Sequence, residues 1–279
     1  RHIHNCSTIS SMRLRTQIGH GVSKQAFLAD YQGTEVVIKM VTRHVLQVKN
    51  CLKRLREVKT VEGETLTYPI FNYSLQEILL SEQLHHPNLA SMLGYCVRSE
   101  ETDTTDISEH GVVSVFERGS SFAVDSLQIL PWPSRLRHAR EMASLLLYLE
   151  LSPLGSLVVP DFKEGHLLMV KDSIKLIDLD DVNSLEPECR VKPGPNTEEC
   201  PYGLRCSRAL CEGFNAKENL KNMNRLVLKR LLFPTTFPSH VIPEVGQLNA
   251  DLDTLKLTAG QLLERLERIQ ALAETQDPT

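Results

Sequence analysis

The stretch from Val158 to Asp181, VVPDFKEGHLLMVKDSIKLIDLDD, carries carboxylates toward both of its ends. Asp161 precedes two short apolar runs, LLMV and IKLIDL, which flank turn-like residues at 171–173 and so predict a β-hairpin. Three further aspartates lie at its C-terminal end: Asp178, Asp180 and Asp181. Carboxylates held apart by a hairpin could orient a hydroxyl group at one end and bind a hard divalent cation at the other. Merely solvated hairpin ends are the alternative.

A lysine lies in the apolar run Val36-Val37-Ile38-Lys39. A buried lysine needs a partner, and Glu77, in the middle of an expected helix, could supply it. Such a pair would hold the amine against phosphate oxygens. Gly19 and Gly21 lie in a turn between two expected strands, where backbone N–H groups could face the same phosphates. The alternatives are a strand lysine that reaches solvent and a surface glutamate.

The residues before about 120 predict the strand-rich part that must position these groups. Its β-type runs are MRLRTQIG, QAFLADY, TEVVIKM, LASMLGYCV and GVVSVFE. Helical patterns cover residues 45–59 and 74–84, and the second ends at the sequence His85-His86-Pro87. The first of these helices is strongly basic, which predicts a solvated face; an acidic or sulfated partner is the alternative.

The remainder of the chain is predicted to be mainly helical. RLRHAREMASLLLYLEL comes before the hairpin, and two further helices are expected at about 215–233 and 249–274. The last carries an apolar stripe: Leu252, Leu255, Leu262, Leu266 and Ile269. A packed C-terminal helix is expected, with a coiled coil as the alternative. We therefore predict one α+β domain over 1–279, with a β-rich N-lobe at 1–118 and a helical C-lobe at 119–279.

Composition narrows the classes of partner. The chain has 279 residues, of which 41% are hydrophobic and 24% charged, so a sizeable core is expected. The net charge of −4 gives no general attraction to nucleic acid or to anionic membranes. The sequence contains no apolar run long enough to span a bilayer. No nucleic-acid partner is therefore expected, and no transmembrane segment is predicted.

Cysteines indicate the compartment. Four lie close together in the sequence: Cys189, Cys200, Cys206 and Cys211. No pair among them has the spacing of a zinc knuckle, so disulfides are favoured over a metal, with three connectivities open. Two glycosylation sequons begin at Asn5 and Asn72, and together with the cysteines they favour an oxidising compartment. Cys6, Cys51 and Cys96 make the number of cysteines odd, so one is expected to be free or to pair elsewhere.

The order of these motifs resembles the protein-kinase fold: a glycine loop, VVIK, a helical glutamate, HPNL and a hairpin flanked by aspartates. The resemblance implies that Asp161 orients or deprotonates the substrate hydroxyl and that Lys163 neutralises the transferring phosphoryl group. It implies that Asp178 binds Mg²⁺ or Mn²⁺. It also implies ATP as the donor. The residues expected to bind ATP are Ile18, Gly19, Gly21, Val37, Lys39, Glu77, Val115, Phe116, Glu117 and Leu168. Among them, the backbone of Val115 to Glu117 is expected to meet adenine, and Ile18, Val37 and Leu168 are expected to line its two faces.

Several positions depart from the kinase pattern. The third glycine of the loop is missing, and the usual His-Arg before Asp161 is absent. His166 stands where a metal-binding Asn is expected, and imidazole suits Mn²⁺ better than Mg²⁺. Asp180 or Asp181 is the alternative second ligand. Pro160 replaces an arginine and no Ala-Pro-Glu follows, so we expect no switching by activation-loop phosphorylation.

A closer resemblance rests on SPLGS, LIDLDD, GYC and CEGFNAKENL. These segments are similar to a family of divergent protein kinases of the secretory pathway. The resemblance implies phosphorylation of tyrosines on secreted and extracellular-matrix proteins, with ATP, in the Golgi lumen or outside the cell. It also implies disulfides in the cysteine cluster and glycosylation. Lys163, in contrast, is typical of serine/threonine kinases. A pseudokinase-type binding module and a kinase-fold enzyme for glycan hydroxyls are the alternatives.

Overall fold

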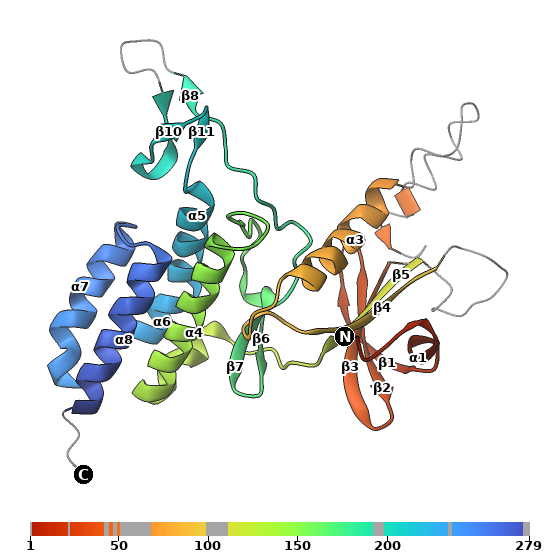
Figure 1. Cartoon of the computed structure of the whole chain (residues 1–279). Coiled ribbons are helices and arrows are strands. Elements are labelled where there is room, and N and C mark those ends of the chain that lie inside the picture. Colours follow the sequence, from red (N-terminus) through yellow and green to blue (C-terminus); the bar gives the residue numbers. More distant parts are fainter. Residues whose placement is uncertain are drawn as a thin grey trace. The chain divides into compact units, whose positions relative to one another are not determined.

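The computed structural model describes residues 2–21, 23–41, 45–46, 49–50, 68–98, 111–191, 198–233 and 236–275. The chain divides into two compact units, each described here by itself (Figure 1). Unit 1 comprises Arg1–His85, Ala90–Gly119 and Asp178–Asp180, and unit 2 comprises His86–Leu89, Ser120–Ile177 and Asp181–Thr279. The short segment Asp178–Asp180 thus packs with the N-terminal residues although it follows the hairpin in sequence.

Unit 1 is built on a five-stranded antiparallel sheet in the order β1-β2-β3-β5-β4. The strands are β1 (Arg13–His20), β2 (Gln25–Tyr31), β3 (Thr34–Val41), β4 (Met92–Arg98) and β5 (Gly111–Glu117). All five predicted strands are confirmed. Strand β3 lies in the middle of the sheet, and its residues from Val36 to Ile38 are buried, as expected for a β-branched run that is covered on both faces.

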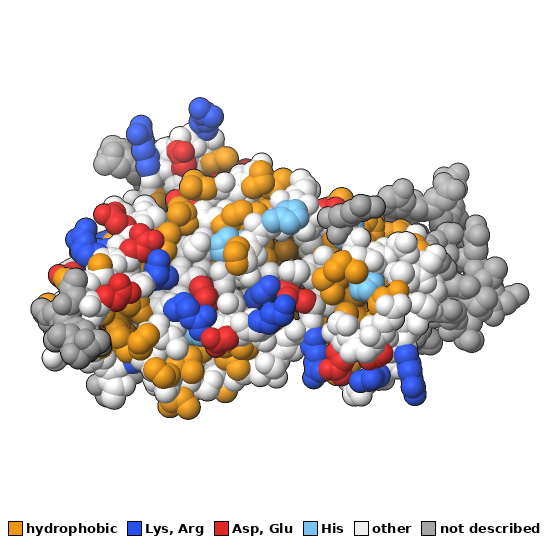
Figure 2. Space-filling view, turned by 60° about the horizontal axis from the view of Figure 1, so that its bottom comes forward, with side chains coloured by type: hydrophobic (Ala, Val, Ile, Leu, Met, Phe, Trp, Pro, Cys, Tyr) orange, Lys and Arg blue, Asp and Glu red, His pale blue; other side chains and the backbone are white. Residues whose placement is uncertain are grey.

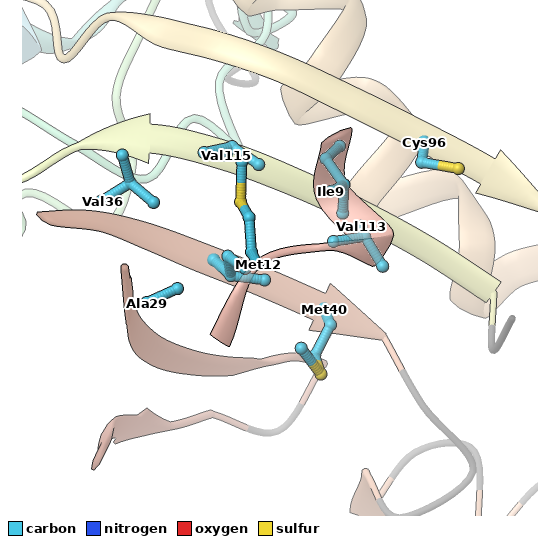
Figure 3. Close-up of a cluster of buried hydrophobic side chains, with 9 residues drawn as sticks. Ile9, Met12, Ala29, Val36, Met40, Cys96, Val113 and Val115 are labelled. Atoms are coloured by element: carbon cyan, nitrogen blue, oxygen red, sulfur yellow. The ribbon is translucent and has the colours of Figure 1, made fainter. Parts of the chain in front are cut away.

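A short N-terminal helix covers part of the sheet. In α1 (Cys6–Ser10), the Asn5 side chain caps the helix by accepting a hydrogen bond from the Thr8 N–H at 3.1 Å. Ile9 of this helix joins the buried apolar cluster of the sheet, which is drawn in Figure 3. Strand β4 comes so close to His4 that a Cβ on Gly94 would clash with the His4 carbonyl oxygen. Only glycine therefore fits at this position.

Helix α3 (Tyr68–Gln83) of unit 1 confirms the prediction for 74–84 and begins earlier. Its residues Glu77, Ile78 and Leu80 are buried, so this face of the helix packs into the unit. The basic helix predicted at 45–59 falls almost entirely outside the described residues. The sequon at Asn72 lies in α3.

Unit 2 contains the helical part and the predicted hairpin. The long helix α4 (Trp132–Glu150) follows a 3₁₀ helix at Val124–Ile129, and buries an apolar face that includes Met142, Leu145 and Leu149. The hairpin consists of β6 (Leu167–Val170) and β7 (Ser173–Leu176). Its two turn residues, Lys171 and Asp172, both have positive φ, which matches a type I′ turn. The hairpin is therefore confirmed, and it ends before the aspartates.

The helix predicted for 215–233 is present as α5 (Phe214–Met223), a π-helical turn at Asn224–Leu228 and α6 (Lys229–Leu232). The single helix predicted for 249–274 is wrong. Residues there form α7 (Ile242–Asp253), after a 3₁₀ turn at Ser239–Val241, and α8 (Ala259–Thr275).

The break between α7 and α8 has a local cause. The Thr258 hydroxyl accepts from the Gln261 N–H at 3.2 Å, and the Gln261 side chain accepts from the Thr258 N–H at 3.0 Å. This reciprocal pair is a capping box, which begins a new helix. Leu255 lies in the break with positive φ, so the predicted stripe of leucines belongs to two helices. Helix α8 packs on α4 rather than forming one long helix with α7.

All six described cysteines form disulfides. Two bonds join the predicted cluster, Cys189–Cys206 and Cys200–Cys211, and the third joins Cys6 to Cys96. Short strand pairs lie in the cluster region: β8 (Arg190–Val191), β9 (Glu198–Glu199), β10 (Cys206–Ser207) and β11 (Leu210–Cys211). A 3₁₀ turn at Pro201–Gly203 lies among them. The prediction of disulfides in the cluster is confirmed. Cys51 lies outside the described residues.

On the face drawn in Figure 2, acidic and basic side chains lie next to one another. Among the described helices, none is long and apolar enough to cross a membrane.

Candidate active site

Five charged residues of unit 1 form a buried charge cluster: Lys24, Lys39, Glu77, Asp178 and Asp180. The Lys39 amine lies 2.5 Å from Glu77 Oε1. The Lys24 amine lies 2.5 Å from Glu77 Oε2, 2.5 Å from Asp180 Oδ1 and 3.1 Å from Asp178 Oδ1. Charges taken out of water are tolerated only when they compensate one another, and this arrangement does so.

Four structural elements supply the cluster. Lys39 comes from the central strand β3 and Glu77 from α3, as predicted. Asp178 and Asp180 follow β7, and Asp178 has a φ of 67°, in the left-handed region that Asp tolerates better than most residues. Lys24 comes from the turn that precedes β2. The side chain of Glu77 is only 2% exposed, and those of both lysines 11%.

Burial and charge act in opposite directions on this cluster. Burial alone would raise the pKa of Glu77, but Lys39 and Lys24 outweigh it and lower that pKa. Burial would likewise lower the pKa of Lys24, yet the three carboxylates raise it. For Asp180, burial outweighs the attraction of Lys24 and raises the pKa to about 6. At neutral pH the carboxylates of Glu77 and Asp180 are therefore ionised opposite the charged Lys24 amine.

The carboxylates suit a hard divalent cation. Three carboxylate oxygens, one from each of Glu77, Asp178 and Asp180, lie within 4.8 Å of one another. Oxygen ligands of this kind are those that Mg²⁺ and Mn²⁺ prefer. Asp178 and Asp180 were predicted as ligands, and the structure brings them together. The predicted ligand His166 belongs to unit 2, as does the exposed Asp181.

The glycine turn lies between β1 and β2. The Gly21 N–H donates to the Lys24 carbonyl oxygen at 2.8 Å, which closes the turn directly before β2. A Cβ at Gly19 would lie 3.3 Å from the Cβ of Ala26, a tight contact that favours glycine. Ile18, expected to line the adenine, is 50% exposed.

The strand predicted to contact adenine is β5. Val115 and Phe116 are buried there, and the Lys39 amine lies 4.6 Å from the centre of the Phe116 ring. The Glu117 N–H donates to the Ser91 carbonyl oxygen at 3.0 Å, so that group is already engaged within the fold. Val37, also predicted to line the ring, is buried in β3, and Leu168 lies in β6 of unit 2. Contact of these residues with adenine stays a prediction.

Unit 2 holds a second group of side chains, the Asp161 cluster, composed of Asp161, Lys163 and His166. The Lys163 amine lies 2.5 Å from Asp161 Oδ2, with side chains that are 56% and 52% exposed. His166 Nδ1 donates to the Asp161 carbonyl oxygen at 2.9 Å, a hydrogen bond that fixes the loop around the aspartate. A carboxylate and an ammonium that both face solvent can approach a hydroxyl-bearing substrate.

Two buried asparagines of α5 support the segment before Asp161. Asn219 accepts from the Val159 N–H at 2.9 Å and donates to the Leu157 carbonyl at 2.7 Å. Asn215 donates to the Ser156 carbonyl at 2.8 Å. Their spacing of four residues on one helix face is visible in CEGFNAKENL, but their role was not predicted. Lys24 was not predicted either; it stands in GHGVSK where the third glycine of a kinase loop is expected.

The sheet, the Lys39–Glu77 pair and the carboxylates after the hairpin are those of a protein-kinase-like fold. Extracellular tyrosine-protein kinase PKDCC of Homo sapiens is 30% identical to this chain over 203 residues, which are 70% of the chain and 39% of that protein. The chain is a homologue of PKDCC, and it spans about two fifths of the length of that relative. No model of a protein family matches the chain.

Two Arabidopsis thaliana proteins share a shorter region with the chain. Probable serine/threonine-protein kinase PBL24 is 33% identical over 98 residues, which are 35% of the chain and 25% of that protein. Putative U-box domain-containing protein 53 is 32% identical over 100 residues, which are 34% of the chain and 11% of that protein. Relatives named as kinases of both specificities support kinase function without fixing the hydroxyl that is phosphorylated.

Proposed function

We propose that this chain is a protein kinase that transfers the γ-phosphoryl group of ATP to protein hydroxyls, chiefly tyrosine. The buried charge cluster carries the proposal, since a strand lysine paired with a helical glutamate lies beside two carboxylates that suit a divalent cation. The similarity to PKDCC supports it, and the choice of tyrosine rests on the name of that relative.

Each part of the chain has a role in this reaction. Lys39, held by Glu77, binds phosphate oxygens, while Asp178 and Asp180 hold the divalent ion. The ion, when bound, neutralises the charge on the transferring group. Asp161 orients the substrate hydroxyl and accepts its proton as the oxygen attacks phosphorus, and ADP leaves. Lys163, 2.5 Å from Asp161, contributes positive charge to the transferring group.

The proposed setting is the secretory pathway, including the Golgi lumen, and the extracellular space. Three disulfides form within the described residues, and such bonds persist in oxidising compartments. The proposed substrates are secreted and extracellular-matrix proteins, in line with the name of the human relative. Glycosylation is proposed at Asn5, which is exposed at the start of α1, and at Asn72.

One observation favours a second candidate, a nucleotide-binding module without transfer activity. The Lys24 amine already lies among the carboxylates that would hold the divalent ion. If this ammonium replaced the ion permanently, the chain would lack a full metal site. The two candidates differ in whether phosphoryl transfer takes place.

A labelling reaction tests the proposal. The purified chain is incubated with γ-labelled ATP, Mg²⁺ or Mn²⁺, and secreted proteins, followed by phosphoamino-acid analysis. We expect phosphotyrosine, and we expect Lys39→Met and Asp178→Ala to abolish it, while Arg15→Met, at an exposed ion pair of unit 1, leaves it intact. Full labelling by both cluster variants would contradict the proposed site. Label that disappears when the substrate is deglycosylated would identify a glycan kinase instead.

A further inference from the structure

Lys24 occupies an unusual position in the buried charge cluster. Its amine contacts all three carboxylates of the cluster, at 2.5, 2.5 and 3.1 Å. Lys39, by comparison, forms its ion pair with Glu77 and lies over the ring of Phe116. The Lys24 amine therefore occupies the position of a cation that is shared by three carboxylates, and the Lys39 amine does not.

The same three carboxylates are available to a divalent cation. Glu77, Asp178 and Asp180 form the oxygen group whose spacing suits a metal ion, and the Lys24 amine contacts one oxygen of each of them. The Lys24 ammonium donates hydrogen bonds to Glu77 Oε2 and Asp180 Oδ1 and forms an ion pair with Asp178 Oδ1, so it engages lone pairs of the carboxylates and repels a second cation. A divalent ion and the Lys24 amine thus compete for the same carboxylates.

The position of Lys24 allows its side chain to move away from the carboxylates. It lies in the turn between β1 and β2, not within a strand, and its backbone is held by the Gly21 N–H at 2.8 Å. Four methylene groups separate the amine from this anchored backbone, so rotation of the side chain moves the charge without moving the turn. A glycine at the same position would give the cluster no such cation.

We propose that Lys24 is an internal counter-ion that competes with the divalent cation for Glu77, Asp178 and Asp180, and so sets the metal affinity of the chain. The inference rests on the proposed function, because it takes these carboxylates to be the metal site of a kinase. Metal binding displaces the Lys24 amine toward solvent or toward the phosphates of a nucleotide. The cation requirement of the chain is then set by one residue of the glycine turn.

Equilibrium binding of Mn²⁺ tests the competition without any kinase assay. Free Mn²⁺ is measured by electron paramagnetic resonance in titrations of the wild type, Lys24→Met, Lys24→Arg and the charge-matched control Arg15→Met. We expect Lys24→Met to bind Mn²⁺ at least tenfold more tightly, and the other two variants to stay within threefold of the wild type. Unchanged or weaker binding by a folded Lys24→Met chain would overturn the inference.

A second measurement uses the wild-type chain, in case Lys24→Met does not fold. Amines are acetylated briefly with and without saturating Mn²⁺, and the label at each lysine is quantified by mass spectrometry. We expect the rate at Lys24 to rise at least threefold with Mn²⁺, and the rate at Lys229, which pairs with Asp253 in unit 2, to stay constant. An unchanged rate at Lys24 would refute the displacement. If Lys24 competes with Mn²⁺ but no phosphoryl transfer takes place, the kinase proposal alone is refuted. If phosphoryl transfer takes place but Lys24 does not compete with Mn²⁺, the inference alone is refuted.

Discussion

The buried charge cluster of unit 1 and the Asp161 cluster of unit 2 contain similar chemical groups in opposite environments. Glu77 is 2% exposed and contacts both lysines of its cluster, whereas Asp161 is 52% exposed and pairs with the solvent-facing Lys163. The charges of the first cluster must compensate one another for the chain to fold, whereas the second cluster forms its ion pair in contact with water. Both stability and activity should therefore depend on the buried charge cluster, whereas activity alone should depend on the Asp161 cluster.

The energetic reason is desolvation. Removing one partner of a buried ion pair leaves an uncompensated charge, which costs several kcal/mol. An exposed pair contributes about 0–1 kcal/mol because water already screens it. Substitutions in the two clusters should therefore have distinct signatures in activity and unfolding.

The largest expected effect is on turnover. Asp161→Asn removes the group that orients and deprotonates the substrate hydroxyl, so we expect kcat to fall by about 10²–10⁴-fold. Because the side chain is exposed, the free energy of unfolding should change by less than about 1 kcal/mol. Steady-state kinetics and urea unfolding check both parts. A kcat within threefold of the wild type would remove Asp161 from the reaction.

The next largest effect is on stability. Glu77→Gln leaves Lys24 and Lys39 without the carboxylate that contacts both, and we expect a loss of about 3–5 kcal/mol in the free energy of unfolding. Glu35→Gln is the matched control, since Glu35 pairs with Arg15 at the surface and should cost about 1 kcal/mol or less. Equal losses in the two variants, measured by urea unfolding, would contradict the contrast between the clusters.

The smallest expected effect concerns pH, and its sign differs between the units. Burial lowers the pKa of His86 in unit 2, and its Nδ1 accepts from the Asn88 N–H at 3.1 Å, so protonation is unfavourable. This contribution to stability is present above pH 6.5 and is lost as the pH falls below it. Asp180 has a raised pKa of about 6, so its contribution is present below pH 3.8 and is lost as the pH rises through about 6.

Thermal unfolding between pH 4 and 7 measures these two contributions. We expect His86→Asn to make stability rise less between pH 5 and 6.5, and Asp180→Asn to make it rise more between pH 4 and 6, by roughly 2 kcal/mol for Asp180→Asn. Burial also lowers the pKa of His4, and the pH dependence of stability that His4 contributes is the same in both variants. Parallel profiles for the wild type and both variants would contradict these assignments.

Local patterns were sufficient to predict the sheet and the hairpin. β3 has a β-branched apolar run, and the turn at Lys171 and Asp172 lies between two apolar segments. The break before α8 was missed because the apolar stripe continued through it, although Thr258 and Gln261 have the spacing of a capping box. The Cys6–Cys96 bond was not predicted, since pairing across 90 residues depends on the tertiary fold.

The site residues could be predicted where the order of the sequence motifs identified them. Lys39, Glu77, Asp178 and Asp180 were predicted as site residues, and the structure brings them together. Lys24 was not, because nothing local indicates that a lysine beside a serine in a polar turn becomes buried. Its burial arises only when the turn before β2 lies against α3 and the segment after the hairpin.

Binding of nucleotide and metal to the buried charge cluster tests the central claim most directly. The melting temperature of the chain is measured with ATP alone, with Mn²⁺ alone and with both, for the wild type and Lys39→Met. We predict stabilisation by ATP and Mn²⁺ together, about 2.7 kcal/mol at a ligand concentration 100-fold above Kd, which Lys39→Met loses. A melting temperature that ATP and Mn²⁺ leave unchanged in the wild type would contradict the account.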